Sequence, residues 1–483
     1  MTALSRRQFL AGAAVVVAFD SRGGRWLTAA AADGGQFTRV PPLDGVLLTD
    51  VATRAADARD EGNIVMQTPA AVLRPGSARD VATMVAFCRP RGIKVAMRGQ
   101  AHSTFGQGLT PGLLIESSAL ASIHSIGPKG AEVDAGVLWR DLIARADQVR
   151  LTPPVITGYT GLSIGGTLSV GGISPAYRSG AQVDHVQALE VVTGTGERLV
   201  CSPDRRRDLF DAVRAGLGQC ALITRAWLDL VPAPPMARTY QLAYTDNATF
   251  FRDQRTLLRR GELDRVFTLW APAGDALLYI LNAVTYFDPA APPDDGRLLR
   301  GLSVPPSAAV KQDAPYLDTV LAVDQVYAAY QAAGWDRLIK PWFDVWLPDA
   351  TVEPYIGAVI PTLTPLDVGA TGFVLLIPAR RSSLRAPLLR VPGATDWVYL
   401  FDILTSSAGP GPDAAFTQQM LARNRRLFER ARAAGGTRYP IGSIPFSRSD
   451  WVRQYGDAWA GLTALKRRYD PDGILTPGPG ILP

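Results

Sequence analysis

The sequence predicts an α+β protein built from more than one domain. Its 483 residues are enough for about three domain-sized units, and 47% of them are hydrophobic, which suffices for several buried cores. Up to about residue 235, segments with helical periodicity alternate with short apolar segments that have the period of strands. The proline-rich run 232–235 ends this pattern, and aromatic strands and amphipathic helices follow over residues 236–430. A second domain is therefore expected after residue 235.

The first region contains the clearest individual elements. Helical patterns cover residues 78–92, 138–147 and 206–214, and strand patterns cover residues 93–98 and 221–230. Residues 188–193 and 197–201 flank Gly-Thr-Gly and predict a β-hairpin. In the second region, the same reasoning predicts an amphipathic helix over residues 413–433.

The N-terminus has the pattern of an export signal. Ser5-Arg-Arg-Gln-Phe-Leu10 precedes the short apolar stretch 11–19, and the small residues 29–32 offer a cleavage site. The apolar stretch is shorter than the ~20 residues that a membrane-spanning helix needs, so no stable membrane span is expected. We therefore predict a twin-arginine signal peptide over residues 1–32 and a periplasmic or extracellular location. The alternative is a buried N-terminal helix.

Charge and composition argue against several classes of partner. The net charge is +6, and the sequence has no dense basic stripe with interleaved aromatic residues, so no nucleic-acid partner is expected. His102, His124 and His185 stand far apart, with no cysteine or carboxylate at metal-ligand spacing, and no metal is expected. The three cysteines are expected to be buried thiols.

The loop over residues 98–107 is the first candidate site. It follows an apolar strand pattern and combines glycine, backbone amides and one imidazole, which suits a ring system held beside its phosphates. The alternative is a solvated loop histidine. The candidate cofactor contacts in this loop are Gly99, Gln100, Ala101, His102, Ser103 and Gln107.

The glycine- and hydroxyl-rich stretch 157–174 is the second candidate site. Its backbone can approach a diphosphate closely, and its serines and threonines can donate hydrogen bonds. The alternative is a plain tight turn. The candidate cofactor contacts here are Gly158, Ser163, Gly165, Gly166, Ser169 and Ile173.

A third glycine-rich segment, residues 216–221, fits the dinucleotide pattern G-x-G-x-x-A. That pattern needs a strand before it and a helix after it. Here the expected helix comes first and the expected strand follows, so a nicotinamide-binding Rossmann site is not expected.

Taken together, these motifs resemble those of the cytokinin dehydrogenases, a branch of the vanillyl-alcohol-oxidase type flavoproteins. The loop of that family has the form Gly-x-Gly-His-Ser-x-x-Gly-Gln. Here it is Gly99-Gln-Ala-His-Ser-Thr-Phe-Gly-Gln107, with Ala101 in place of the second glycine. Further matching stretches follow in family order at residues 162–169, 191–197, 216–219, 222–225, 340–342, 448–451, 469–471 and 476–478.

The resemblance implies a fold and a cofactor. It implies a two-subdomain PCMH-type FAD-binding domain over residues 33–235, an inserted α+β substrate (cap) domain over residues 236–430, and a return to the FAD-binding domain over residues 431–483. His102 would carry FAD through a covalent bond from a ring nitrogen to the flavin methyl carbon, while the glycine-rich stretches would hold the diphosphate. Ile223 and Thr476 would also contact the cofactor. Related enzymes with two links add a cysteine near the second glycine stretch; residues 157–163 contain none, so a single histidyl link is expected.

The middle region supplies candidate catalytic residues. Asp344 and Asp402 interrupt apolar strand patterns, and an unpaired buried carboxyl there would have a raised pKa and could act as a base. The alternative is that each carboxyl lies on the solvent face of its strand. By the family likeness, the strand of Asp402 lines the cavity over the flavin, and Trp342 forms part of the same wall.

The sequence departs from the family at the catalytic base. Cytokinin dehydrogenases use an Asp just before the second glycine stretch and a Glu in the cap domain, and alignment places Gly158 and Asn282 at those positions. Because glycine cannot accept a proton, either Asp402, Tyr159 or Asp344 does this work or the substrate is not a cytokinin. We favour a different substrate.

The resemblance therefore implies a FAD-dependent oxidoreductase that removes hydride from a C–H bond beside an amine or hydroxyl of a small-molecule substrate. Electrons would then pass to oxygen or another acceptor. The alternatives are a true cytokinin-type amine dehydrogenase with a relocated base, an alcohol or sugar oxidase, and a non-catalytic flavin-binding protein.

Overall fold

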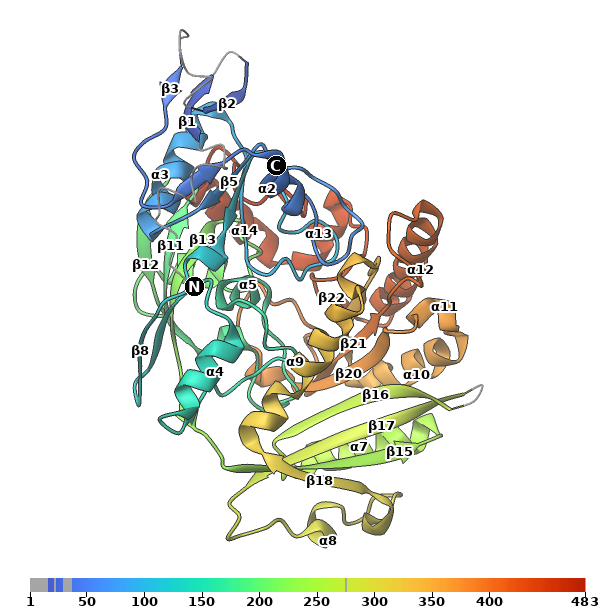
Figure 1. Cartoon of the computed structure of the whole chain (residues 1–483). Helices are drawn as coiled ribbons and strands as arrows, with labels where there is room; N and C mark the ends of the chain where they lie inside the picture. The colour runs from blue at the N-terminus through green and yellow to red at the C-terminus, as the bar shows by residue number, and fades with distance from the viewer. Residues whose placement is uncertain (1–15, 21–22, 29–36, 274–275, 483) are drawn as a thin grey trace.

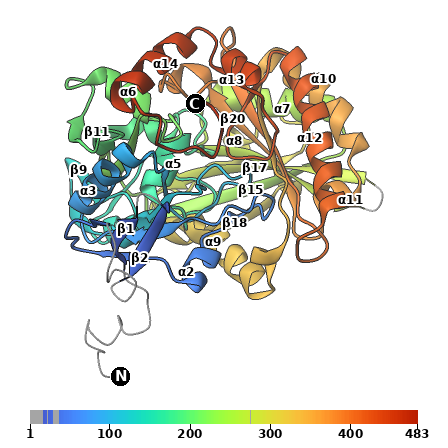
Figure 2. The same cartoon turned by 90° about the horizontal axis from the view of Figure 1, so that it is seen from above.

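The computed structural model describes residues 16–20, 23–28, 37–273 and 276–482. Within this part of the chain, helices and strands are mixed in two halves that lie side by side (Figure 1). Seen from above, α7, α10 and α12 gather on one side of the molecule, and α3, α6 and α14 lie on the other (Figure 2). The predicted α+β class is confirmed.

The first half begins with a four-stranded sheet of order β4-β5-β7-β6. Its strands are β4 (Val46–Leu48), β5 (Ala71–Arg74), β6 (Val95–Arg98) and β7 (Leu113–Glu116). Helix α3 (Ala78–Cys88) covers this sheet with buried Val81, Met84 and Val85. It ends before the predicted residue 92, because Pro90 has no N–H to donate and Gly92 turns into the left-handed region at φ 63°.

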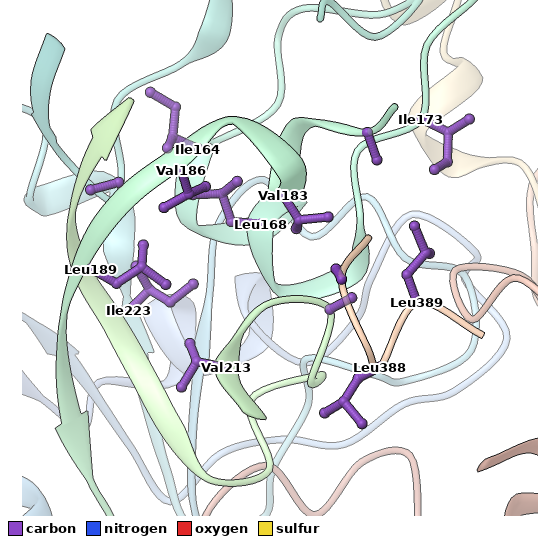
Figure 3. Packing of buried hydrophobic residues seen from close by; sticks show 14 of the residues in the cluster. Ile164, Leu168, Ile173, Val183, Val186, Leu189, Val213, Ile223, Leu388 and Leu389 are labelled. Atoms are coloured by element: carbon purple, nitrogen blue, oxygen red, sulfur yellow. The ribbon is translucent and has the colours of Figure 1, made fainter. Parts of the chain in front are cut away.

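A five-stranded antiparallel sheet forms the second subdomain. In spatial order its strands are β12 (Arg198–Cys201), β11 (Val186–Thr193), β13 (Ala221–Leu228), β9 (Gly130–Asp134) and β8 (Ile123–Gly127). The predicted hairpin is confirmed as β11 and β12, and the predicted strand as β13. Helix α5 (Ile164–Val170) packs on this sheet, and Figure 3 shows its Ile164 and Leu168 in one cluster with Leu189 of β11 and Ile223 of β13.

The second half is organised by an eight-stranded antiparallel sheet, here called the cap sheet. In spatial order its strands are β18 (Val310–Pro315), β15 (Met236–Tyr244), β17 (Ala276–Phe287), β16 (Arg265–Ala273), β20 (Phe373–Arg380), β21 (Trp397–Leu404), β19 (Phe343–Pro348) and β22 (Thr437–Arg438). Helices α7 (Asn247–Arg260), α10 (Asp349–Val359) and α12 (Ala414–Ala433) bury one face of this sheet. The predicted helix over 413–433 is confirmed as α12, with Asp413 as its N-cap.

The other α-helices of the described residues are distributed over both halves. They are α2 (Val51–Ala56), α4 (Trp139–Asp147), α6 (Arg207–Val213), α8 (Asp295–Leu298), α9 (Tyr316–Ala332), α11 (Pro365–Val368), α13 (Arg448–Tyr455) and α14 (Ala458–Tyr469). Two short strands, β10 (Leu151–Thr152) and β14 (Val231–Pro232), pair with each other. In the sequence, β14 lies just before β15, the first strand of the cap sheet. The predicted helices over 138–147 and 206–214 are confirmed as α4 and α6.

After α12 the chain returns to the first half. Its strand β22 still pairs with β19 of the cap sheet, so this sheet continues past residue 430. Leu475 then forms a parallel bridge with Val95 of β6, and Thr476 N–H donates to the Val95 carbonyl at 2.8 Å. The C-terminal segment thus joins the four-stranded sheet, while the predicted domain boundaries stay predictions.

The predicted export signal falls only partly within the described residues. The twin arginine segment Ser5 to Leu10 and the small residues 29–32 lie outside them. The end of the apolar stretch is strand β1 (Val16–Asp20), not a helix, and it pairs with β2 (Arg25–Thr28) and β3 (Thr38–Arg39). Export stays a prediction. Among the described helices, none combines the length and apolarity needed to cross a membrane. The three cysteines are buried free thiols, as predicted.

Candidate active site

A cavity of about 620 Å³ lies between the first half and the cap sheet. Every residue that the sequence singled out for cofactor binding or catalysis lines it. These residues are Gly99, Gln100, Ala101, His102, Ser103, Gln107, Gly158, Tyr159, Ser163, Gly165, Gly166, Ser169, Ile173, Ile223, Trp342, Asp344, Asp402 and Thr476. Segments far apart in the sequence therefore meet around one space. We call the side formed by the first half and the C-terminal segment the glycine wall, and the side formed by the cap sheet the cap wall.

The loop over residues 98–107 is fixed by hydrogen bonds to Asp60 and to the C-terminal segment. Ala101 has φ 53°, the left-handed conformation that glycine adopts without strain, at the position where the family's loop has its second glycine. The Gly106 N–H donates to Asp60 Oδ2 at 2.6 Å. The Gln107 amide donates to carbonyls of residues 440–442 at 3.0–3.2 Å, which ties the loop to the C-terminal segment.

Glycines let this loop and the start of α5 approach each other closely. A Cβ added at Gly99 would lie 1.8 Å from Ser163 Oγ, and one added at Gly165 would lie 2.7 Å from Ala135 Cβ. The hydroxyls of Ser163 and Ser117 are buried and have no hydrogen-bond partner in the described chain, although both residues line the cavity. Orphaned buried hydroxyls beside close-packed backbone are the groups that a phosphate-bearing ligand would satisfy. The residues present thus fit FAD.

His102 lies where the two walls meet. Its ring centroid is 5.3 Å from that of Tyr159, 5.7 Å from Tyr327 and 5.2 Å from Trp342. Within the described chain, the imidazole makes no hydrogen bond. Burial lowers the pKa of His102; the Glu61 carboxylate opposes this and the Lys340 ammonium adds to it. The imidazole is therefore neutral near pH 7, which leaves a lone pair on one ring nitrogen.

Three residues near His102 escaped the sequence analysis. Tyr327 of α9 stacks on Tyr159 with ring centroids 4.0 Å apart and planes 12° apart, and nothing in its helical context distinguishes it beforehand. Lys340 has a fully buried ammonium that lies 3.1 Å from Glu61 Oε1. The stretch containing Lys340 did match the family, but the match gave it no role, and only the fold places Glu61 beside it.

The cap wall is made of alternate residues on neighbouring strands. One row crosses four strands through the register pairs Leu269 to Leu375, Leu375 to Asp402, and Asp402 to Asp344. Because successive side chains of a strand point to opposite faces, several alternate residues on either side of this row also face the cavity. These additional residues are Arg265, Phe267, Phe373, Ile377, Leu400 and Leu404. The cap wall is thus apolar except for two carboxyls and one arginine.

The two carboxyls of the cap wall are buried. Asp344 is 0% and Asp402 4% exposed, so the solvent-facing alternative is wrong for both. Burial raises the pKa of Asp344 to about 7. Burial and the neighbouring Asp344 charge raise the pKa of Asp402 well above its usual value. The cavity therefore contains carboxyls that can exchange a proton near neutral pH.

Known proteins match this chain over most of its length. A family model described as an FAD binding domain matches residues 69–202, and one described as "Cytokinin dehydrogenase 1, FAD and cytokinin binding" matches residues 264–482. The chain is 33% identical over 440 residues to the "uncharacterized oxidoreductase ORF5 in fasciation locus" of Rhodococcoides fascians, covering 90% of this chain and 99% of that protein. It is 31% identical to cytokinin dehydrogenase 6 of Oryza sativa subsp. japonica over 90% of this chain and 91% of that protein. The chain belongs to the cytokinin dehydrogenase family of FAD-dependent oxidoreductases.

The chain differs from the cytokinin dehydrogenases at the two positions where that family has its catalytic Asp and Glu. Gly158 lines the cavity and leaves open space, since a Cβ added there would meet nothing within 4 Å. Asn282, the other aligned position, is buried in β17 outside the cavity lining, where its amide donates to the Ile280 carbonyl at 3.0 Å. Neither position supplies a proton acceptor to the cavity.

Proposed function

We propose that this protein oxidises a C–H bond beside an amine or hydroxyl of a small molecule, with FAD attached covalently to His102. The observation that carries the proposal is the position of His102. A neutral imidazole without a hydrogen-bond partner shares one cavity with close-packed glycine backbone and unsatisfied serine hydroxyls. When bound, FAD supplies the two-electron acceptor for the reaction.

The residues of this chain have separate roles in the proposal. Gly99, Gly165 and Ser163 would hold the nucleotide part of the cofactor, and Tyr159 and Trp342 would enclose its ring near His102. Thr160 donates from its N–H and hydroxyl to Asp324 of α9, both at 2.8 Å, so the cap restrains the second glycine stretch. These contacts orient the cofactor and keep bulk water from the reacting carbon.

Proton removal from the substrate falls to a group other than Gly158. The candidates are Asp402, Asp344 and Tyr159. Burial raises the pKa of Tyr159, and its ring stacks on Tyr327, which makes a phenolate unfavourable there. The two carboxyls of the cap wall are better suited to accept a proton at neutral pH.

Acid precipitation tests the covalent link. We expect the yellow colour to stay in the washed pellet of the wild-type protein and to leave the His102→Ala pellet, because only this imidazole lies in the cavity. His124→Ala is the matched control, since His124 pairs with Asp134 outside the cavity, and its flavin should remain attached. Colour retained by His102→Ala would refute the link.

An anaerobic substrate panel tests the reaction. Bleaching of the bound flavin by an amine or alcohol supports the enzyme, and the substrate class that bleaches it chooses between cytokinin-type amines and alcohols or sugars. A yellow protein that no member of a broad panel bleaches supports the non-catalytic alternative. Reoxidation of the bleached protein by air, compared with quinone dyes, identifies oxygen or another compound as the electron acceptor.

We also propose export by the twin-arginine route, supported by the Ser5-Arg-Arg-Gln-Phe-Leu10 pattern. This route carries folded proteins, which suits a chain that must acquire FAD before it leaves the cell. Cell fractionation of the full chain and of a variant with both arginines replaced by lysine tests it. The wild type should be found outside the inner membrane and the variant inside, and equal distribution of the two would refute export by this route.

A further inference from the structure

Asp344 and Asp402 stand directly opposite each other on two adjacent strands. The antiparallel register of β19 and β21 pairs these two residues, and directly opposed side chains have Cβ atoms about 5 Å apart. Both residues line the cavity, and their carboxyl groups lie within hydrogen-bonding reach of each other. They form a carboxyl dyad at the centre of the cap wall.

The dyad has no donor of its own in the described chain. Both oxygens of Asp344 and Oδ1 of Asp402 are buried without a hydrogen bond from a backbone or side-chain donor. Gly442 presses against Asp344, since a Cβ there would lie 2.0 Å from Oδ2, so the carboxyl has little room to turn away. Buried carboxylates without donors are costly, whereas a single proton shared between them satisfies both.

The charged and titratable groups around the dyad come from the C-terminal segment. The Arg438 guanidinium of β22 lowers the pKa of Asp344 but forms no ion pair with either carboxyl, because it donates instead to the Gly442 carbonyl at 2.9 Å. The Tyr439 hydroxyl accepts from Gly172 N–H at 3.3 Å, and burial raises the pKa of this phenol. With one nearby cation and two carboxyls, the dyad holds one proton and one negative charge near neutral pH.

We propose that Asp344 and Asp402 act as one proton-accepting dyad for the N–H or O–H of the substrate. This inference rests on the proposed function, because it assumes that the substrate is oxidised in this cavity. The dyad replaces the carboxylate that is absent at Gly158. It also defines the substrate class: primary or secondary amines and alcohols have the required proton, and tertiary amines do not.

The step balances in atoms and electrons. The substrate C–H bond breaks, and its hydrogen and both bonding electrons go to oxidised FAD. The adjacent N–H or O–H bond also breaks, and its proton goes to the ionised carboxylate of the dyad. A C=N or C=O double bond forms in the product. The dyad then carries two protons and returns one to solvent before the next turnover.

Single and double asparagine variants of the holoprotein test the dyad. Asp344→Asn and Asp402→Asn should each slow anaerobic flavin reduction by about 10²–10⁴-fold, the usual contribution of a positioned base. The double variant should be little slower than either single one, because the two residues work as a unit. KM and flavin content should change little, and the acid limb of the pH profile of kcat/KM should disappear. Asp253→Asn is the control, a buried cap carboxyl outside the cavity, and it should reduce its flavin at the wild-type rate.

A measurement without turnover separates this inference from the proposed function. Infrared difference spectra between about pH 5 and about pH 9 should contain a protonated-carboxyl band that the double variant lacks. The dyad would be overturned if the double variant kept this band. It would also be overturned if both single variants reduced their flavin at the full rate with an unchanged pH profile. Either result would leave the proposed flavin-dependent oxidation untouched. Failure of the proposed function would instead give a wild-type protein that no substrate bleaches.

Discussion

The two walls of the cavity are built from different parts of the polypeptide. The glycine wall consists largely of backbone, with Gly99, Gly165 and Gly166 allowing loops to approach within contact distance of Ser163 and Ala135. The cap wall consists of side chains, with Trp342 and alternate residues of four strands facing the cavity. Relatives that share a cofactor can hold it with the same backbone geometry. Relatives that differ in substrate can do so by exchanging side chains.

This difference explains where the chain departs from its family. On the glycine wall, Ala101 stands where the family has glycine, and it adopts a positive φ of 53° that glycine reaches without strain. On the glycine wall, Gly158 stands where the family has a carboxylate, and on the cap wall Asp344 and Asp402 face each other. The proposed dyad would place the proton-accepting group on another wall of the cavity without a change of fold.

The largest effect is expected from adding a side chain where two backbone segments of the glycine wall are in close contact. Gly478→Ala would place a Cβ 2.1 Å from the Gly106 carbonyl oxygen, so the loop bearing His102 or the C-terminal segment must shift. We expect loss of most bound flavin, measured by the visible absorbance of the purified protein. Gly461→Ala in α14 meets nothing within 4 Å and should keep full flavin content. Equal flavin in both variants would contradict the backbone model of this wall.

Removing the largest side chain of the cap wall should cost stability. Trp342 is 3% exposed and packs with Tyr327 and Trp335, so Trp342→Ala should lower the free energy of unfolding by about 3–5 kcal/mol. Urea unfolding of the holoprotein measures this. Trp459→Ala, at a half-buried tryptophan, should lose clearly less. If both variants lost the same free energy of unfolding, the cap wall would have to repack into the space left by the Trp342 ring.

The pH dependence of stability distinguishes the two walls further. Burial raises the pKa of Asp60 on the glycine wall and of Asp344 on the cap wall to about 7 in each case, above the ~3.9 of an unfolded Asp. A raised pKa means that the folded state binds the proton more tightly. The stability that each group contributes is therefore complete below about pH 4 and is lost as the pH rises to about 7, by about 4 kcal/mol for a pKa difference of about 3.

Asparagine variants measure each contribution as a difference from the wild type. Asp344→Asn should flatten part of the decline between about pH 4 and about pH 7, and Asp60→Asn should flatten a separate part. Unfolding curves at several pH values provide the comparison. The quantity to plot is the unfolding free energy of the wild type minus that of the variant. If this difference increased with pH for both variants, the pKa shifts would have the opposite direction.

The smallest effect is expected at Ala101, which is one of several residues of the glycine wall with a positive φ. Ala101→Gly should stabilise the protein by about 0.5–1 kcal/mol, because glycine adopts a positive φ without the strain of a Cβ. Ala96→Gly in β6 is the control, and it should destabilise the protein by about the same amount. Thermal unfolding compares the two, and a destabilised Ala101→Gly would show that the Cβ packs more than it strains.

In both halves, elements with local signals could be predicted from the sequence. The hairpin of β11 and β12 is marked by its turn, and α12 by its periodicity and the capping Asp413. The end of α3 was placed too late, since the helical pattern continues through residue 92 although Pro90 stops the hydrogen bonding. On the cap wall, the sequence identified Asp344 and Asp402 singly but left their burial open.

The sequence by itself determined the loop in which Gly99 and His102 stand close together, because covalent neighbours in one loop remain neighbours in any fold. Only the tertiary structure decided the groups that act across elements. Strand register set Asp344 against Asp402, α9 brought Tyr327 onto Tyr159, and the ordering of loops placed Lys340 beside Glu61. Such contacts depend on which strands and helices pack together, and that choice is made by the whole core rather than by any local pattern.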